Sequence, residues 1–305
     1  MNPSLSTLAR RAAKICCFAA VTALFAWLLS AAIVIWRLTH RARQPFAEPI
    51  PSWGAESIEE IRIETSDGEC LGAWFLASSD ARTSIVILHG NGGSRSSEAE
   101  LLRQLFAERV SVLAPTLRAH GDSTGTTNDF GWSARADVIA CVAFLERRIP
   151  GTKIVVLGNS VGSAAAIYAA KELDHRVTAY VLEAPYRDIR AATHHRLAAY
   201  LPPPLDDVAY AGLRLLAPVM LSPRLDDLSP IGRITDIPAN VAVVFLSGAE
   251  DRLAPIAEVE EIHSHCAAGS KLVAFPGAGH HDLAATDPTR YAATLREVLA
   301  GIRAR

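Results

Sequence analysis

The sequence predicts a mixed α/β fold in which helices cover both faces of a mostly parallel β-sheet. Short runs of apolar residues recur along the chain, such as SIVIL at 84–88 and KIVVL at 153–157, and stretches with helical spacing separate them. Strands that are apolar throughout are buried on both faces, and strands joined by helices run parallel. Half of the 305 residues are hydrophobic. The chain can therefore bury a large core.

The expected elements follow one another in a regular order. An antiparallel hairpin comes first, because Asp67 and Gly68, a pair typical of tight turns, separate residues 57–65 from residues 70–76. Strands are then expected at 84–90, 110–115, 153–158, 177–182, 241–246 and 271–275, and helices at 95–108, 132–148, 161–172, 255–266 and 282–300. Residues 185–240 interrupt this alternation and are rich in proline and apolar side chains. We expect them to form a small helical lid over the strand ends.

An uncharged segment of 22 residues, from Ile15 to Trp36, lies near the start of the sequence. As a helix it is about 33 Å long, enough to cross the hydrocarbon core of a bilayer. The alternative is a cleaved signal peptide, whose apolar core is shorter, roughly 7–15 residues. We expect one transmembrane helix at about 15–36 within an anchor of residues 1–44. Residues 45–56 are expected to be a linker, and residues 57–305 the globular domain.

The distribution of charge supports a membrane-anchored protein that does not bind nucleic acid. Three basic residues lie on each side of the apolar segment, and the first 44 residues contain no acidic residue. This symmetry leaves the orientation in the membrane undetermined. The remaining chain is acidic, which argues against nucleic-acid binding. Only four of the 30 basic residues are lysine, a composition typical of GC-rich bacterial genomes. A single-pass protein of the bacterial inner membrane is therefore expected.

The segment Gly158-Asn159-Ser160-Val161-Gly162 has the pattern G-x-S-x-G. The pattern alone is weak, because glycine and serine are common residues. Here it follows an expected strand and opens an expected helix, which is the setting that exposes a nucleophilic serine on a sharp turn. Ser160 is thus the candidate nucleophile. The alternative is an ordinary glycine-rich turn.

A second glycine-rich turn, His89 to Ser94, follows the expected strand at 84–90. Backbone N–H groups in such a turn can approach a substrate closely and stabilise a negatively charged oxygen. We assign the N–H groups of Asn91 and Val161 to an oxyanion hole. A phosphate-binding loop is excluded as the alternative, because no G-K-[ST] sequence follows. The five cysteines lack metal-ligand spacing, and we expect no disulfide, metal or cofactor.

Two further loops carry a candidate acid and a candidate base. Asp251 follows the expected strand at 241–246, and His280 follows the one at 271–275. An imidazole can take the proton of a serine near neutral pH, and a carboxylate holds that imidazole in the required tautomer. His281 is an alternative base, and Glu183 is an alternative acid.

The motifs HGNGGS, RAHGDSTG, GNSVGS, SGAEDRLAP and FPGAGHHDL resemble, in this order and spacing, the alpha/beta-hydrolase superfamily. The similarity covers about residues 58–300 and is nearest to membrane-anchored serine hydrolases of the serine-aminopeptidase-like and depalmitoylase-like branch. It implies the alpha/beta-hydrolase fold and a Ser160-Asp251-His280 triad, with His280 rather than His281 as the base. The sequence departs from the family pattern at Thr116, where aspartate is common, and at Ala119, where glycine is usual.

The resemblance implies a serine hydrolase that cleaves carboxylic esters or thioesters through an acyl-enzyme. The expected substrate is a small or lipid-like acyl compound. A serine peptidase of the same fold is one alternative. A catalytically inactive, membrane-tethered binding protein is another, and an intact triad argues against it.

Overall fold

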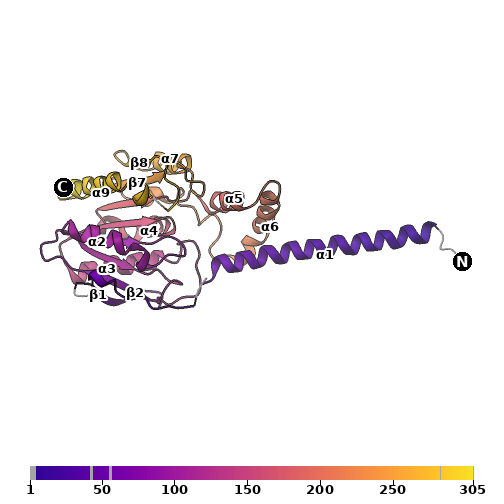
Figure 1. Ribbon diagram of the computed structural model, residues 1–305, viewed down its shortest axis with the longest axis horizontal. Coiled ribbons are helices and arrows are strands. Elements are labelled where there is room, and N and C mark those ends of the chain that lie inside the picture. Colours follow the sequence, from indigo (N-terminus) through magenta and orange to yellow (C-terminus); the bar gives the residue numbers. More distant parts are fainter. Residues whose placement is uncertain (1–4, 42–43, 55–56, 282, 305) are drawn as a thin grey trace.

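The computed structural model describes residues 5–41, 44–54, 57–281 and 283–304 (Figure 1). Parts of the expected anchor and linker, residues 1–4, 42–43 and 55–56, lie outside the described residues. Eight strands form one sheet in the order β1-β2-β4-β3-β5-β6-β7-β8. Strands β1 and β2 pair antiparallel, as do β2 and β4, and the other neighbours are parallel. The strands are β1 Glu59–Glu64, β2 Cys70–Leu76, β3 Thr83–Leu88, β4 Ser111–Pro115, β5 Lys153–Asn159, β6 Ala179–Glu183, β7 Ala242–Gly248 and β8 Lys271–Phe275.

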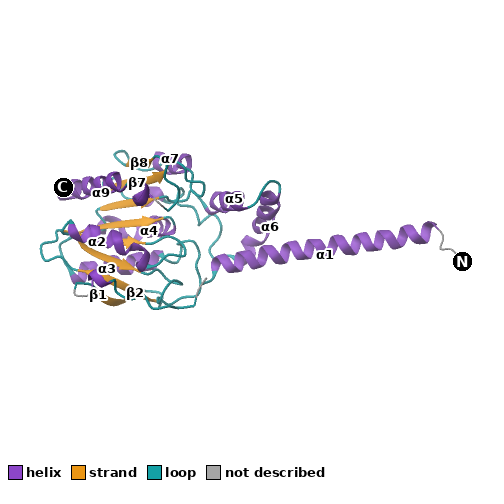
Figure 2. Ribbon diagram, in the orientation of Figure 1, coloured by secondary structure: helices purple, strands orange, loops and turns teal. Residues whose placement is uncertain are grey.

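Helices cover the two faces of this sheet, as Figure 2 shows. The helices of the body are α2 Ala99–Ala107, α3 Arg135–Arg148, α4 Val161–Leu173, α7 Ile256–Ser264, α8 Leu283–Thr286 and α9 Pro288–Ala304. One core cluster joins the sheet to α3, α4 and α7, and the other joins it to α2 and α9. The predicted layered α/β architecture, with its antiparallel hairpin at one edge, is confirmed.

The central strand β3 shows why the inner strands contain continuous apolar runs. Val86 and Leu88 point into the core cluster beside α3 and α4, whereas Ile85 and Ile87 point into the cluster beside α2 and α9. Successive side chains of a strand lie on opposite faces, so a strand covered on both sides needs apolar residues at every position. Because β3, β5, β6, β7 and β8 run parallel, their carboxyl ends lie at the same edge of the sheet.

The insertion between β6 and β7 contains two helices, α5 Ile189–Tyr200 and α6 Leu205–Met220, which form the predicted lid. Asp188 caps α5, because its side chain accepts hydrogen bonds from the backbone N–H groups of Arg190 and Ala191. Both helices lie near the point where the long N-terminal helix meets the body (Figure 1).

The N-terminal helix α1, Leu5–Thr39, projects away from the body as a long rod (Figure 1). It extends beyond the predicted segment 15–36 at both ends. Its portion Ala9–Thr39 is long and apolar enough to cross a membrane, and little of its most apolar part is buried against the protein. The part near the body contacts α6, where Ala31 and Ile35 join Leu213 and Ala217 in a small apolar cluster.

The segment that follows α1 packs against the body and does not act as a free tether. The side chain of Arg41 donates hydrogen bonds to the backbone carbonyl oxygens of Gly121, Ser123 and Gly125. Farther along, the carboxylate of Glu48 is fully buried. The linker predicted at 45–56 is therefore folded onto the body over its described residues. These contacts join the chain just after α1 to the body.

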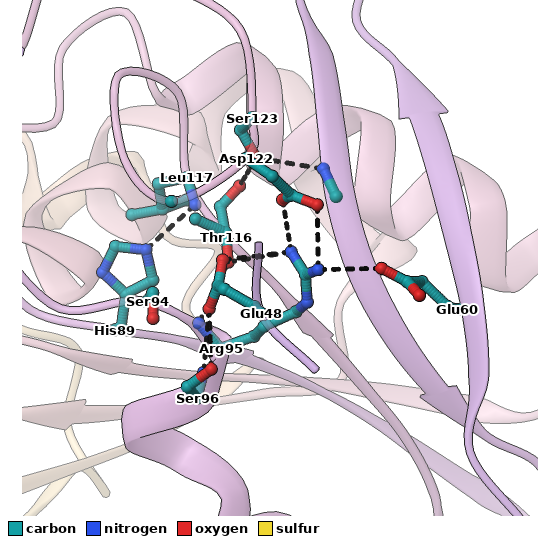
Figure 3. Close-up of polar contacts among 12 residues, drawn as sticks. Glu48, Glu60, His89, Ser94, Arg95, Ser96, Thr116, Leu117, Asp122 and Ser123 are labelled. Carbon is teal, nitrogen blue, oxygen red and sulfur yellow. Dashed lines mark hydrogen bonds and ion pairs between the residues drawn. The ribbon is translucent and has the colours of Figure 1, made fainter. Parts of the chain in front are cut away.

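Figure 3 shows how Glu48 is held by a buried cluster around Arg95. Nη1 of Arg95 lies 3.1 Å from Glu48 Oε1 and 2.5 Å from Asp122 Oδ1, and Nη2 lies 3.1 Å from Glu60 Oε1. Glu48 also accepts hydrogen bonds from the hydroxyl of Thr116 and from Ser96. The fully buried guanidinium thus joins the post-α1 segment to β1, to the end of β4 and to the turn before α2. Buried charges persist only when they are paired in this way.

Candidate active site

Ser160 lies on a strained turn between β5 and α4. Its φ is +49° and its ψ is −107°, a conformation that residues with a side chain rarely adopt. The backbone holds this turn, because the Ser160 N–H donates to the Glu183 carbonyl oxygen at 2.8 Å. The turn places the Ser160 hydroxyl at the N-terminus of α4, where partial positive charge favours a developing anion.

The two glycines of the G-x-S-x-G pattern permit this geometry by close approach. A Cβ atom at Gly158 would lie 2.5 Å from the carbonyl carbon of Gly162, and one at Gly162 would lie 2.4 Å from the carbonyl oxygen of Leu88. Both contacts are with backbone atoms that cannot move away cheaply. The spacing of the motif therefore reflects tight packing of the turn against β3 and the first turn of α4.

The structure brings the three predicted triad residues together. His280 Nε2 lies 3.0 Å from Ser160 Oγ, and His280 Nδ1 lies 2.7 Å from Asp251 Oδ2. The other carboxylate oxygen, Asp251 Oδ1, accepts hydrogen bonds from the N–H groups of Leu253 and Ala254. These bonds orient the carboxylate toward the imidazole. All three residues of the triad are buried.

The loops that carry the acid and the base are joined to one another by their backbones. The N–H of Ala249 donates to the Phe275 carbonyl oxygen, and the N–H of Glu250 donates to the Ala278 carbonyl oxygen. Since the β7 and β8 loops leave neighbouring parallel strands, these bonds fix the spacing between Asp251 and His280. A fixed spacing keeps the imidazole aligned between carboxylate and hydroxyl.

The glycine-rich turn after β3 lies beside Ser160, and Asn91 and Val161 line the same cavity as Ser160. Two neutral imidazoles support this turn. The N–H of Gly92 donates to His120 Nε2, and the buried His89 accepts a hydrogen bond from the N–H of Leu117. Burial lowers the pKa of His89 to about 3, and burial also lowers the pKa of His120. Both side chains support the turn and stay uncharged near neutral pH.

The alternative residues occupy other positions. The exposed His281 stacks edge to face on His280, with ring centroids 4.3 Å apart, and lines a second, more polar cavity, which shares Asn91 with the cavity above Ser160. Glu183 accepts hydrogen bonds from Asn159 and from the Tyr291 hydroxyl, on the other side of the serine turn. Burial raises the pKa of Glu183 to about 7. Among the described residues, His280 Nε2 is the hydrogen-bond partner of Ser160 Oγ, and Asp251 is the partner of His280 Nδ1.

The cavity above Ser160 encloses about 700 Å³, including space open to solvent, and has a mostly apolar lining. The lid contributes Ile189 and Leu213, and the body contributes Phe130. Val34 and Leu38 of α1 also line it, a contribution that the sequence did not reveal. Because α1 is apolar on all sides, no periodic pattern in its sequence distinguishes the side that faces the cavity.

Most of the chain matches one known protein family. The profile of the alpha/beta hydrolase family matches residues 85–294, which is more than half of the chain. The chain belongs to the alpha/beta hydrolase family.

Individual relatives agree with this assignment. An uncharacterized protein of Mycobacterium tuberculosis, Rv2307c, is 29% identical over 272 residues, which cover 86% of this chain and 88% of that protein. The uncharacterized membrane protein YNL320W of Saccharomyces cerevisiae is 22% identical over 73% of this chain and 74% of its own length. The esterase Pf2001 of Pyrococcus furiosus superposes with a TM-score of 0.67 at 21% identity, covering 85% of this chain and 98% of that one. At this identity the structural likeness shows the fold alone.

Both departures of this alpha/beta hydrolase from its family pattern have a structural consequence. Ala119 has a φ of +60°, a left-handed conformation that glycine adopts without steric cost. Thr116 donates its hydroxyl hydrogen bond to Glu48, whose carboxylate also pairs with Arg95. Where the family commonly has an aspartate, this chain therefore has Thr116 bonded to a carboxylate from the segment after α1.

Proposed function

We propose that this alpha/beta hydrolase is a serine hydrolase of carboxylic esters or thioesters. The observation that carries the proposal is the continuous chain of hydrogen bonds from Asp251 through His280 to Ser160, at the base of an apolar cavity. A hydroxyl bonded to an imidazole whose far nitrogen meets a carboxylate is the arrangement required for nucleophilic acyl transfer.

In the proposed mechanism, Ser160 Oγ attacks the carbonyl carbon of the substrate, and His280 Nε2 takes the hydroxyl proton. The carbonyl oxygen becomes an anion and accepts hydrogen bonds from the N–H groups of Asn91 and Val161. His280 then gives its proton to the departing alcohol or thiol, which leaves an acyl-enzyme on Ser160. A water molecule, deprotonated by the same imidazole, releases the carboxylic acid and restores the serine.

The apolar lining of the cavity favours an acyl chain over a peptide as the group held beside Ser160. The proposed arrangement in the cell is a single-pass membrane protein, anchored by residues 1–44, with residues 57–305 as the catalytic domain. The length and composition of α1 support the anchor, and one relative is a membrane protein by name. We propose the bacterial inner membrane as the location.

The proposal is tested by hydrolysis of p-nitrophenyl esters, acyl-thioesters and peptide anilides by the full-length protein and by Ser160→Ala. We expect the wild-type protein to cleave esters or thioesters, and Ser160→Ala to lose this activity because the nucleophile is absent. Preference for anilides would favour the peptidase alternative. Ester cleavage that survives in Ser160→Ala would refute the assigned nucleophile.

A further inference from the structure

Helix α1 supplies part of the wall of the cavity that contains Ser160. Val34 and Leu38 line this cavity together with Ser160 and His280. A second apolar cavity of about 500 Å³ lies between α1 and α6 and shares Leu38 and Leu213 with the first. The two cavities adjoin, and both linings are mainly apolar, with Arg190, Arg196 and Arg214 as their charged members.

The contact between α1 and α6 is close. Trp27 donates a hydrogen bond from Nε1 to the Val208 carbonyl oxygen at 3.0 Å. A Cβ atom at Gly212 would lie 3.1 Å from the side chain of Ala31 and 3.1 Å from the Trp27 ring. Small residues that allow such an approach are typical of helices that pack inside membranes. The lid helix is thus attached to the anchor as well as to the body.

The position of this contact along α1 determines how deeply α6 would lie in the bilayer. Trp27 precedes Trp36 by nine residues, which is about 14 Å along a helix, and lies within the uncharged segment 15–36. If that segment lies in the hydrocarbon core, α6 must also lie among lipid chains. Its outer surface suits this environment, because exposed apolar side chains follow one another at the spacing of a single helical face: Leu205, Val208, Leu215 and Val219.

We propose that α6 is embedded in the leaflet through which α1 leaves the body, and that the acyl chain of a bilayer-resident ester enters sideways between α1 and α6 to reach Ser160. This inference rests on the proposed ester hydrolysis and names its substrate as a lipid whose acyl chain never has to leave the bilayer. The exposed apolar face of α6 lies beside the exposed apolar surface of α1, so the same lipid chains would cover both.

The test of the path uses full-length protein in phosphatidylcholine vesicles. The substrates are 4-methylumbelliferyl oleate, which dissolves in the bilayer, and the water-soluble butyrate ester. Leu38→Trp fills the path, so we expect the ratio of kcat/KM for oleate to that for butyrate to fall about tenfold. The matched control is Leu29→Trp, an exposed position on the same helix, which should leave the ratio unchanged. Equal ratios in the two variants would overturn the lateral route.

The test of the embedded helix uses the same assay. Val219→Asp places a charge on the outer face of α6, where Val219 is 86% exposed. We expect it to lower oleate hydrolysis in vesicles several-fold, because a charge is costly in the leaflet. Ala268→Asp, in the exposed turn before β8, is the control. Equal rates in these variants would show that α6 lies outside the bilayer. If the wild-type protein hydrolyses neither ester, the proposed function is refuted, and with it the substrate proposed here.

Discussion

Two adjacent histidines end the loop after β8, and the structure gives them different surroundings. His280 is buried between Ser160 and Asp251, whereas His281 is exposed and lines a second cavity that does not include Ser160. Their neighbouring positions make the pair a sharp test of the assigned roles, because both variants perturb the same loop.

We expect His280→Ala to lower turnover on the order of 10³-fold or more, because among the described residues His280 is the group placed to accept the Ser160 proton. His281→Ala should cause a much smaller loss. The measurement is kcat on one soluble ester for both variants, with far-UV circular dichroism to verify folding. A larger loss in His281→Ala would mean that the base has been assigned to the wrong residue.

Glu183 is expected to act on stability rather than on proton transfer. Its pKa is raised to about 7 by burial, from an ordinary value of 4.5. Between these values the folded protein retains a proton that the unfolded chain releases, so the free energy of unfolding falls as pH rises through this window. In Glu183→Gln this contribution is absent. We expect Tm of the variant to rise relative to wild type between pH 5 and pH 8.

The same variant distinguishes the two candidate acids. Glu183→Gln should retain most of the turnover, whereas Asp251→Asn should lose on the order of 10³-fold or more, because the amide no longer selects the required tautomer of His280. The opposite order of losses would indicate that Glu183 is the acid of the triad.

At the scale of secondary-structure elements, the segment after α1 is an integral part of the body. Glu48 is buried against Arg95 and Thr116, although it lies close to the end of a helix that leaves the body. Through Glu48, the segment connects the end of α1 to β1, to the end of β4 and to the turn that precedes α2. Its contribution to the free energy of unfolding can be measured directly.

We expect Glu48→Ala to lower the free energy of unfolding by about 3 kcal/mol, because it leaves a buried guanidinium with one fewer partner. Glu59→Ala is the matched control, since Glu59 pairs with Arg148 at the surface. There the loss should be under about 0.5 kcal/mol. Chemical denaturation of both variants in detergent measures the difference. Similar losses would show that the buried cluster contributes no more than a surface pair.

The elements that the sequence predicted well are those whose signal is local. Strands β3 and β5 each contain an uninterrupted apolar run, at residues 85–88 and 154–157, and the glycines around Ser160 mark a tightly packed turn. The cluster around Arg95 could not be predicted in this way. Its members come from distant parts of the chain, and charged residues such as Glu48 and Glu60 are normally found at the surface.

At the scale of the whole molecule, the sequence predicted an anchor and a catalytic body but not their contact. Apolar residues surround α1, so nothing in its sequence distinguishes Val34 and Leu38 from residues that face lipid. The contact with α6 depends on Gly212, whose significance becomes visible only when Trp27 and Ala31 lie beside it. The N-terminal helix of this alpha/beta hydrolase therefore lines part of the cavity that contains Ser160.

The central claim, that Ser160 is the nucleophile of this alpha/beta hydrolase, is tested most directly by covalent labelling. Full-length protein is treated with a fluorophosphonate, and the modified peptide is identified by mass spectrometry. We expect one adduct, on Ser160, and none in Ser160→Ala, since the hydroxyl bonded to His280 is the one activated for attack. An adduct on another serine, or undiminished labelling of Ser160→Ala, would contradict the account.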